Sequence, residues 1–389
     1  MTDKIQRLIK KNASRVRRAG ALLWEVAASN VRYTYSSDKK IYAEIEKIRR
    51  RYVFQLLNVL SFTDYEVHVG VGPGTVDKYV RQREGFRISD ANNHRSVLTR
   101  PAPRDEYIFL SDQKRELSRA SGWKKKVYVD DDCFEENTTG FPVPFGVHPA
   151  QVLAGRDREL GWYRAQDSEA TLLFAGACQP GEYATDEITD LFGKVPRNAL
   201  YDMLRRILEE EDYTTTRNPE RFLGTDGKVD AALFVLSDGV DNRVAKEEWL
   251  RVLAAADFFV AGPGVYMPMS HNAIEALAVG TIPIIEYPEL FAPDLSAAGA
   301  CVPFSGRKEF EEQVRSCLAM DRAFRKELKR NAREYYDTHL APKEVGKALQ
   351  RKVLDPPLEA PDKMEKITVI AGHESANVLK AKSKKTHAE

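Results

Sequence analysis

Over residues 256–287, short runs of apolar residues are separated by segments rich in glycine, proline and polar residues. The apolar run Phe258–Ala261 ends in a Gly-Pro-Gly turn, and Ser270 then stands where the N-cap of a helix belongs. The run Ala273–Ala278 favours a helix, Gly280 follows it as a stop signal, and Ile282–Ile285 is again a short β-rich run. The pattern therefore predicts a strand, a loop, a helix and a second strand, in that order.

The same alternation of strand-like and helix-like segments runs through most of the chain. Short apolar runs that end in glycine, serine or aspartate predict strands, and longer amphipathic runs predict helices. The predicted strands are Tyr65–Val71, Tyr107–Leu110, Val127–Val129, Thr171–Ala175, Ala231–Leu236 and Cys301–Phe304, and the predicted helices are Ile41–Leu60, Arg197–Glu209, Lys246–Ala255 and a pair over Lys308–His339. Because such alternation with right-handed crossovers gives parallel sheets, we expect an α/β protein with two Rossmann-like, doubly wound domains that face a cleft.

The stretch Phe141–Pro149 is rich in proline, has no periodicity and is typical of a linker or hinge. It divides a chain of 389 residues, which is long enough for two domains of ordinary size. We therefore expect a basic helical segment over residues 1–50, an N-terminal Rossmann-like domain over 51–150, a C-terminal Rossmann-like domain over 165–345, and a C-terminal tail over 355–389.

Composition narrows the class of protein. Hydrophobic residues make up 43% and charged residues 30% of the sequence, which is typical of a soluble globular protein, and the apolar runs are too short to cross a bilayer. The start of the chain lacks the apolar core of a secretory signal, and the four cysteines have no metal-ligand spacing. The expectation is a cytoplasmic protein with reduced thiols.

Positive charge concentrates at the start of the chain, although the net charge is only +1. Residues 1–51 contain fourteen Lys and Arg against five Asp and Glu. Two interpretations stay open: a solvated helix face, or peripheral attraction to an anionic membrane surface or an acidic partner. Nucleic acid is not expected as a partner, because no nucleic-acid-binding motif accompanies the charge.

The loop Pro263–Asn272 is the first candidate site. A helix start leaves free N–H groups beside the positive end of the helix dipole, which suits a pyrophosphate. Glu275 follows His271 by four residues and Asn272 by three, so these side chains share a helix face from which a carboxylate can accept bonds from ribose hydroxyls. Simpler roles stay open: a salt bridge for Glu275 and a bond to a buried carbonyl for His271. The ligand-binding candidates of this module are Gly264, Tyr266, Ser270, His271, Asn272 and Glu275.

A second candidate site follows the predicted strand Thr171–Ala175. Gly176 would let a ligand approach the backbone where the sheet opens. Arginines follow on the next predicted helix, and a guanidinium aimed at a diphosphate is the usual neutralising group where no metal is present. Arg197 and Arg205 are the two candidates, with a surface position as the alternative for either.

Three adjacent acids, Asp130, Asp131 and Asp132, follow the predicted strand Val127–Val129. Three uses are open for them: binding a metal, capping a helix or a solvated turn, and acting as a general base that deprotonates a hydroxyl. The segment Val69–Gly74 does not complete a dinucleotide-binding fingerprint, because Thr75 stands at the position of the third glycine.

The second half of the chain resembles the nucleotide-sugar glycosyltransferases of GT-B architecture, and within them the exostosin-like branch. Members of that branch pair a strand ending in Phe-Ala-Gly with a later segment of a strand, Pro-x-Gly, a serine, and Glu-Ala-x-x-x-Gly-x-Ile-Pro-Val-Ile. The matching residues here are Phe174-Ala175-Gly176, then Pro263, Gly264, Ser270, Glu275-Ala276, Gly280 and Ile282–Ile285. The resemblance covers residues 172–304, and His271-Asn272 replaces the basic residue that often follows the serine.

The resemblance implies a GT-B transferase that moves a sugar from a nucleotide-diphosphate sugar, with a UDP-sugar favoured, to a hydroxyl of a glycan or glycolipid acceptor. The C-terminal domain would hold the donor and the N-terminal domain the acceptor. It further implies an inverting reaction without an obligatory metal or other cofactor, with Asp130–Asp132 as the candidate base and an arginine stabilising the departing diphosphate. A role in surface polysaccharide or glycan synthesis is expected by analogy.

Two other functions fit the same architecture. A nucleotide-sugar epimerase would turn over its donor without an acceptor. A non-catalytic sugar- or nucleotide-binding protein would bind without turnover and would be indifferent to changes at Glu275 and Asp130–Asp132.

Overall fold

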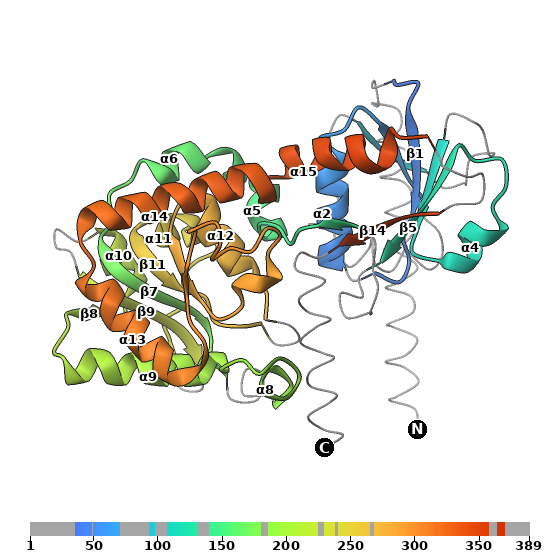
Figure 1. The fold of residues 1–389 in the computed structure, drawn as a ribbon. Helices are drawn as coiled ribbons and strands as arrows, with labels where there is room; N and C mark the ends of the chain where they lie inside the picture. Colours follow the sequence, from blue (N-terminus) through green and yellow to red (C-terminus); the bar gives the residue numbers. More distant parts are fainter. Residues whose placement is uncertain are drawn as a thin grey trace, which may run out of the picture. The chain divides into compact units, whose positions relative to one another are not determined.

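The computed structural model describes residues 36–48, 50–70, 93–97, 107–130, 140–179, 186–224, 229–237, 240–264, 268–357 and 364–369. The chain forms two compact units. The first contains Met1–Asp132, Thr139–Val143 and Val345–Ile370, and the second contains Pro144–Glu344. Each unit has its own mainly parallel sheet with helices packed on it (Figure 1), so the predicted α/β fold with two such sheets is confirmed.

The first sheet has the strand order β3-β2-β1-β4-β5-β14-β6, and all neighbouring strands are parallel. This is the 3-2-1-4-5-6 order of a Rossmann sheet, with β14 inserted between the last two strands. The strands are β1 (Lys40–Glu44), β2 (Glu66–Gly70), β3 (His94–Val97), β4 (Tyr107–Ser111), β5 (Lys125–Asp130), β6 (Phe141–Val143) and β14 (Glu365–Val369). The helices are α2 (Arg50–Leu60), α4 (Lys114–Arg119), the end of α15 (Pro342–Leu349) and the π-helical turn Gln350–Leu354.

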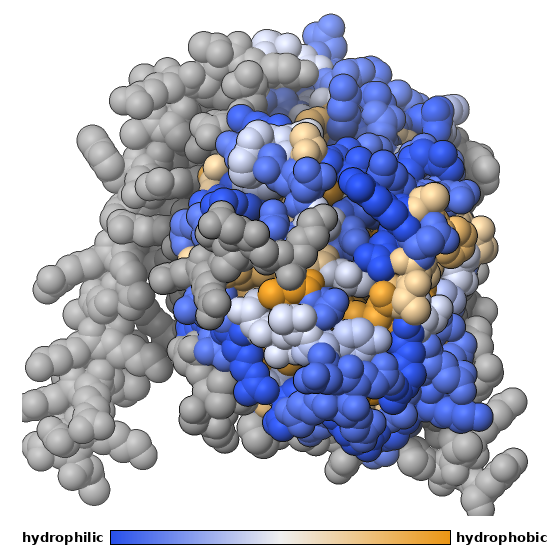
Figure 2. Space-filling view, turned by 90° about the vertical axis from the view of Figure 1, so that its left-hand side faces the viewer, coloured by the Kyte–Doolittle hydropathy of each residue, from blue (hydrophilic) through white to orange (hydrophobic). Residues whose placement is uncertain are grey.

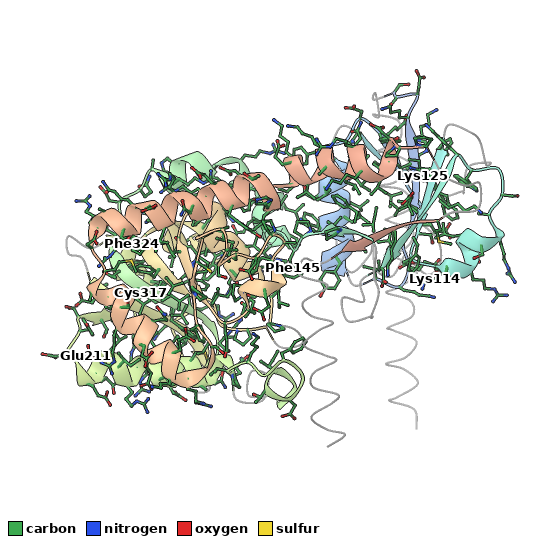
Figure 3. The ribbon with its side chains drawn as sticks, viewed as in Figure 1. Lys114, Lys125, Phe145, Glu211, Cys317 and Phe324 are labelled. Atoms are coloured by element: carbon green, nitrogen blue, oxygen red, sulfur yellow. The ribbon has the colours of Figure 1, made fainter. Side chains whose placement is uncertain are left out.

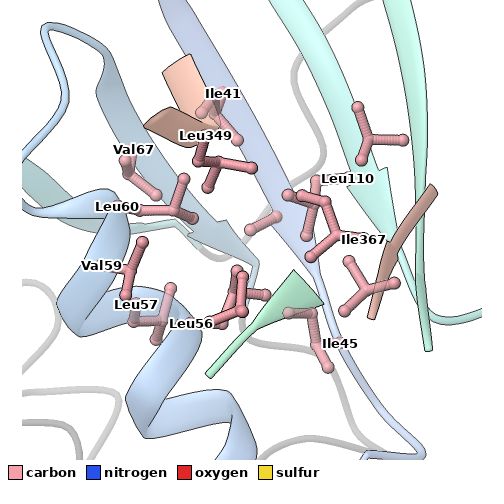
Figure 4. Close-up of a cluster of buried hydrophobic side chains, with 14 of the residues drawn as sticks. Ile41, Ile45, Leu56, Leu57, Val59, Leu60, Val67, Leu110, Leu349 and Ile367 are labelled. Atoms are coloured by element: carbon pink, nitrogen blue, oxygen red, sulfur yellow. The ribbon is translucent and has the colours of Figure 1, made fainter. Parts of the chain in front are cut away.

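The hydrophobic core of the first unit lies between the sheet, α2 and the end of α15. Ile41, Leu110 and Ile367 come from three different strands and are fully buried in this core (Figure 4). A Cβ atom on Gly346 would lie 2.6 Å from the carbonyl oxygen of Val59, so glycine at this position allows α15 to pack closely on the end of α2. The segment after residue 344 therefore belongs to the core of the first unit.

The second sheet has the order β10-β9-β7-β11-β12-β13, with β8 also beside β9 and with β10 antiparallel to β9. Its strands are β7 (Ala170–Ala177), β8 (Thr215–Thr216), β9 (Val229–Ser237), β10 (Val240–Asp241), β11 (Ala256–Val260), β12 (Ile282–Ile285) and β13 (Val302–Pro303). Its helices are α5 (Pro149–Leu153), α6 (Leu160–Arg164), α8 (Asp186–Phe192), α9 (Arg197–Glu210), α10 (Pro219–Gly224), α11 (Trp249–Ala254), α12 (His271–Val279), α13 (Gly306–Ala319), α14 (Arg322–Tyr335) and the start of α15, with single 3₁₀ or π turns at Arg156–Arg158, Pro288–Leu290 and Tyr336–Leu340.

Helices cover both faces of the second sheet. α9 and α13 lie side by side on one face, and α11, α12 and α14 cover the other (Figure 1). The outer surface of this unit that Figure 2 presents is largely hydrophilic, with small separate apolar areas. The apolar side chains of the sheet therefore pack against the helices that cover its two faces.

The predicted strand-loop-helix-strand module is confirmed. Ser270 is the N-cap residue of α12 and has the extended backbone of that position, with φ −130° and ψ 153°. Gly280 ends the helix with φ 85°, a left-handed conformation that a residue with a side chain rarely adopts. β11 and β12 then pair in parallel, as the two flanking apolar runs predict.

Three parts of the predicted organisation are wrong. The predicted linker Phe141–Pro149 begins with β6, which pairs with β14 in the first sheet. The start of the predicted helix Ile41–Leu60 is instead β1, a strand at the centre of the first sheet, and the helix begins only at Arg50. The expected C-terminal tail contains β14, which pairs with β5 and β6. These three segments are short, and their strand conformation depends on partners far away in the sequence. Residues 1–35 of the basic segment and residues 371–389 of the tail lie outside the described residues.

Candidate functional site

The candidate site of the second unit lies at the carboxyl edge of its sheet, where β7 and β11 are neighbours. The chain leaves β7 toward β8 and β9 on one side and returns to β11 on the other side. Such a topological switch point opens a crevice outside the carboxyl ends of the two strands, and ligands of open α/β sheets bind there. Gly176 near the end of β7 and Gly262 just after β11 mark the two sides of this point.

Arg197 lies at this switch point. It is the first residue of α9, is only 6% exposed, and donates from Nη2 to the carbonyl oxygen of Gly262 at 3.2 Å. A Cβ atom on Gly262 would lie 2.8 Å from Arg197 Cγ, and one on Gly176 would lie 3.1 Å from Nη1. The two glycines thus provide the room for a guanidinium between the strand ends, whereas the sequence suggests that Gly176 makes room for a ligand.

Arg205, the second arginine candidate, lies two turns further along α9 than Arg197 and is partly exposed. Its guanidinium pairs with Glu209 four residues later on the same helix, at 3.3 Å, and 41% of its side chain is exposed. The structure therefore brings Arg197, but not Arg205, to the two glycines.

The N-terminus of α12 supplies the other predicted ligand-binding residues. The side chain of its N-cap residue, Ser270, makes no capping hydrogen bond. Gly264 precedes this helix, and its N–H donates to the carbonyl oxygen of Pro268 at 3.1 Å, which closes the loop. Asn272 lies in the first turn and is partly exposed. Tyr266 lies outside the described residues.

His271 contacts the segment just after Pro144, where the described part of the second unit begins. Its Nδ1 lies 2.6 Å from the carbonyl oxygen of Gly146, so this nitrogen carries the proton and donates it. Its ring stacks on Phe145 with centroids 4.1 Å apart, and Phe145 is labelled in Figure 3. The buried-carbonyl role that the sequence leaves open for His271 is the one the structure shows.

Glu275 is engaged with the same segment. Its side chain is almost fully buried, at 1% exposure for the residue. The backbone N–H of His148 donates to Oε1 at 2.9 Å, and Nε1 of Trp249 donates to Oε2 at 2.6 Å. Both carboxylate oxygens thus have donors from the protein, so Glu275 anchors the segment around His148 to α12.

Asp130, at the end of β5 in the first unit, is the described member of the acidic triplet. It is buried and pairs with Nζ of Lys366 on the adjacent strand β14, at 2.7 Å. Asp131 and Asp132 lie outside the described residues. The pairing with Lys366 was not visible in the sequence, because strand β14 itself was not predicted.

Glu286 is a buried residue that the sequence analysis misses. It follows β12, and its carboxylate accepts from the backbone N–H of Val195 at 2.5 Å and from that of Gly306 at 2.8 Å. Burial raises the pKa of Glu286, and these two bonds oppose that rise. An acid directly after the apolar run Ile282–Ile285 was the available signal, since such positions lie at the carboxyl edge of a parallel sheet.

Tyr287, the next residue, is fully buried beside Ser270 and Arg197. Burial raises its pKa to about 12, so the phenol stays protonated at neutral pH. Cys178, just after β7, is also buried, and burial raises the pKa of its thiol to about 11 although Arg197 opposes the rise. Neither group is therefore ionised at neutral pH, and Arg197 is the charged group that we place at this crevice.

Among the residues that the structure describes, no three His, Cys, Asp or Glu side chains gather closely enough to hold a metal ion. None of the helices that the structure describes has the length and apolarity needed to span a bilayer.

No protein-family model and no curated protein sequence matches the chain. Among solved structures it is similar to the N-terminal domain of trehalose-6-phosphate phosphatase from Candida albicans, with 10% identity over 82% of this chain and 98% of that one, and a TM-score of 0.43. It is similar to AviGT4, a glycosyltransferase involved in avilamycin A biosynthesis, with 14% identity, coverage of 81% and 96%, and a TM-score of 0.38. It is also similar to HepE of Anabaena in complex with UDP, with 11% identity, coverage of 82% and 100%, and a TM-score of 0.39. At these low identities, the function proposed below rests on the chain's own residues.

Proposed function

We propose that the chain is a glycosyltransferase that transfers a sugar from a nucleotide-diphosphate sugar to a hydroxyl of a glycan or glycolipid acceptor. A UDP-sugar is the favoured donor, and an inverting reaction without an obligatory metal is the favoured chemistry. The observation that carries the proposal is the buried guanidinium of Arg197 at the switch point between β7 and β11. Arg197 lies beside Gly176, the last residue of the Phe174-Ala175-Gly176 match, and this adds support.

Arg197 suits a diphosphate for an electrostatic reason. A guanidinium presents several N–H donors in a planar fork, and it interacts more strongly in a buried crevice than in water. The first turn of α12 adds uncapped N–H groups at the same edge of the sheet. Donors that are fixed before the reaction stabilise the charge that develops on a departing diphosphate.

The acceptor side of the proposal lies in the first unit. Asp130, Asp131 and Asp132 remain the candidates for the base that removes the acceptor proton. The bond between Asp130 and Lys366 holds one of these carboxylates in a fixed place at the end of β5. The basic residues 1–51 would bring the protein to an anionic membrane surface, where a lipid-linked acceptor is available.

A nucleotide panel tests the donor part of this proposal. The purified full chain is titrated with UDP, GDP, CMP and dTDP, with and without manganese, and binding is followed by thermal shift and calorimetry. The expected result is stabilisation by UDP that does not depend on manganese. Absence of binding by every nucleotide at about 1 mM, a concentration that detects weak complexes, would overturn the proposal.

A non-catalytic nucleotide-binding protein is the second candidate, and one observation favours it. The carboxylates of Glu275 and Asp130 both have partners within the protein, which leaves fewer groups for chemistry. Incubation with UDP-sugars separates the two candidates. Release of UDP that increases with an added glycan acceptor supports the transferase, and UDP binding without any release supports the binding protein.

A further inference from the structure

A groove of about 480 Å³ lies between the first turns of α9 and α13 in the second unit. Asn198, Asp202 and Met203 line it from α9, and Arg307 lines it from α13. The two helices pack against each other on one face of the sheet (Figure 1). The volume falls in the range of small-molecule sites, so the groove is large enough for a ligand of one or two sugar rings.

Arg206 of α9 also lines the groove, and its guanidinium pairs with Glu210 and Glu311. The other polar side chains of the groove have no ion pair among the described residues. Oδ1 of Asn198 is buried and accepts no hydrogen bond within the part of the chain that the structure describes. The carboxylate of Asp202 has neither a hydrogen bond nor an ion pair in the same ranges. The guanidinium of Arg307 reaches only Sδ of Met203, at 3.8 Å, and a thioether is a weak acceptor. Because buried polar atoms are nearly always paired, the buried Oδ1 of Asn198 points to a bound molecule. Asp202 and Arg307 are exposed, and they add polar groups that such a molecule can reach.

The walls of the groove are held at a fixed separation by Glu286. Its carboxylate accepts from the N–H of Val195, two residues before α9 begins, and from the N–H of Gly306, the first residue of α13. Lys194 adds a bond from Nζ to the carbonyl oxygen of Glu286, at 2.6 Å. A site whose walls are already fixed loses less conformational freedom when a ligand binds.

The chemistry of the unpaired groups selects the kind of ligand. Asn198 Oδ1 and Asp202 need donors, and Arg307 needs an acceptor. A phosphate can satisfy Arg307 but is repelled by Asp202, whereas a hydroxyl both donates and accepts. We propose that this groove binds a neutral carbohydrate, whose hydroxyls donate to Asn198 and Asp202 and accept from Arg307. The inference does not depend on donor binding at Arg197, and it adds a separate glycan site to the proposed transferase.

Saturation-transfer NMR on the full chain tests this site, with maltotriose, cellotriose and triacetylchitotriose as probes and inorganic phosphate as the competing anion. We expect at least one saccharide to bind with millimolar affinity, and Asp202→Ala and Arg307→Ala each to weaken it about tenfold, a change that such titrations resolve. Lys308→Ala is the matched control, because the side chain of Lys308 is 93% exposed and does not line the groove.

Three outcomes would overturn the inference. The first is that no saccharide of the panel binds at about 10 mM, well above a millimolar dissociation constant. The second is saccharide binding that Asp202→Ala and Arg307→Ala leave unchanged. The third is binding of phosphate alone, lost in Arg307→Ala. UDP titrations of the same variants keep this test apart from the proposed function, because UDP binding at Arg197 should not change in either variant.

Discussion

The two sheets carry opposite charges at the same topological position. In the first sheet the switch point lies between β1 and β4, and there the carboxylate of Asp112 accepts from the backbone N–H groups of Glu46 at 3.0 Å, Lys47 at 2.5 Å and Ile48 at 2.8 Å. In the second sheet the switch point lies between β7 and β11, and there the guanidinium of Arg197 donates to a carbonyl oxygen.

This difference shows that one fold can place a negative or a positive group at its switch point. The loop after the first strand of a Rossmann sheet is the usual seat of a phosphate, because its N–H groups are free. In the first unit these N–H groups already bind the chain's own carboxylate, and Asp112 would repel a second anion. In the second unit the fixed charge is positive and attracts an anion. The diphosphate site that we propose is therefore expected in the second unit.

Removal of the Asp112 carboxylate is the test with the largest expected effect. In Asp112→Ala, three N–H groups lose their acceptor in a buried place, and we expect the first unit to lose about 4 kcal/mol of its free energy of unfolding. Native-state hydrogen exchange of the β1 and β4 amides measures this loss for that unit alone. Asp38→Ala, at an exposed acid of the same unit, is the control and should change nothing. Equal effects of the two substitutions would mean that the Asp112 bonds contribute little.

Removal of the Arg197 guanidinium tests the switch point of the second sheet. We expect Arg197→Gln to weaken UDP binding about 100-fold, because a charge-assisted bond in a buried crevice is lost. Calorimetric titration measures the change. Arg205→Gln, on the exposed side of the same helix, should bind UDP as the wild type does. Arg197→Lys keeps the charge but not the planar fork, so intermediate affinity is expected. Wild-type affinity in Arg197→Gln would contradict the assignment of the diphosphate to this crevice.

Substitution of Glu275 sharpens the description of the α12 end of the site. In Glu275→Gln, one of the two oxygens becomes an amide nitrogen, so the donors of His148 and Trp249 can no longer both be satisfied. We expect the second unit to lose about 2 kcal/mol of its free energy of unfolding. Trp249→Phe removes one of the same bonds and should cost less. A stable Glu275→Gln protein with strongly weakened UDP binding would instead support the ribose-binding role suggested by the sequence.

As the pH is lowered, the first unit should lose stability before the second. This is the smallest of the expected effects. Burial lowers the pKa of His94 in the first unit to about 4, although a bond to the Leu57 carbonyl opposes this. The unfolded chain therefore takes up a proton that the folded unit does not, and the first unit loses stability as pH falls from 6.5 to about 4. In the second unit, burial raises the pKa of Asp257, but Lys329, Ser168 and Arg325 lower it below its usual value of 3.8.

The contribution of Asp257 is present above that usual value and is lost only at lower pH. Hydrogen exchange of peptides from each unit over pH 3–7 should therefore show earlier loss of protection in the first unit. His94→Gln should move the loss in the first unit to lower pH and leave the second unit unchanged. Simultaneous loss in both units would contradict this account.

Local sequence signals predict the structure correctly where neighbouring residues decide it. Ser270, Gly280 and the run Ile282–Ile285 predict the ends of α12 and the strand after it, and the structure confirms all three. Arg197 was recognised as a candidate because it follows a glycine at a strand end, and it lies beside that glycine. The bonds of His271 to Gly146 and of Glu275 to His148 could not be predicted, because these partners lie more than 120 residues earlier in the chain.

The α/β class, the alternation of strands and helices in both halves, and the ends of α9 and α12 follow from the sequence alone, because hydrophobic periodicity, caps and glycine stops act over a few residues. Only the tertiary structure decided that Lys40–Glu44 is a central strand, that β14 inserts between β5 and β6, and that Asp112 and Glu286 bind backbone N–H groups. These features depend on pairing between distant strands and on the desolvation of charged groups that burial brings. Neither leaves a local trace in the sequence.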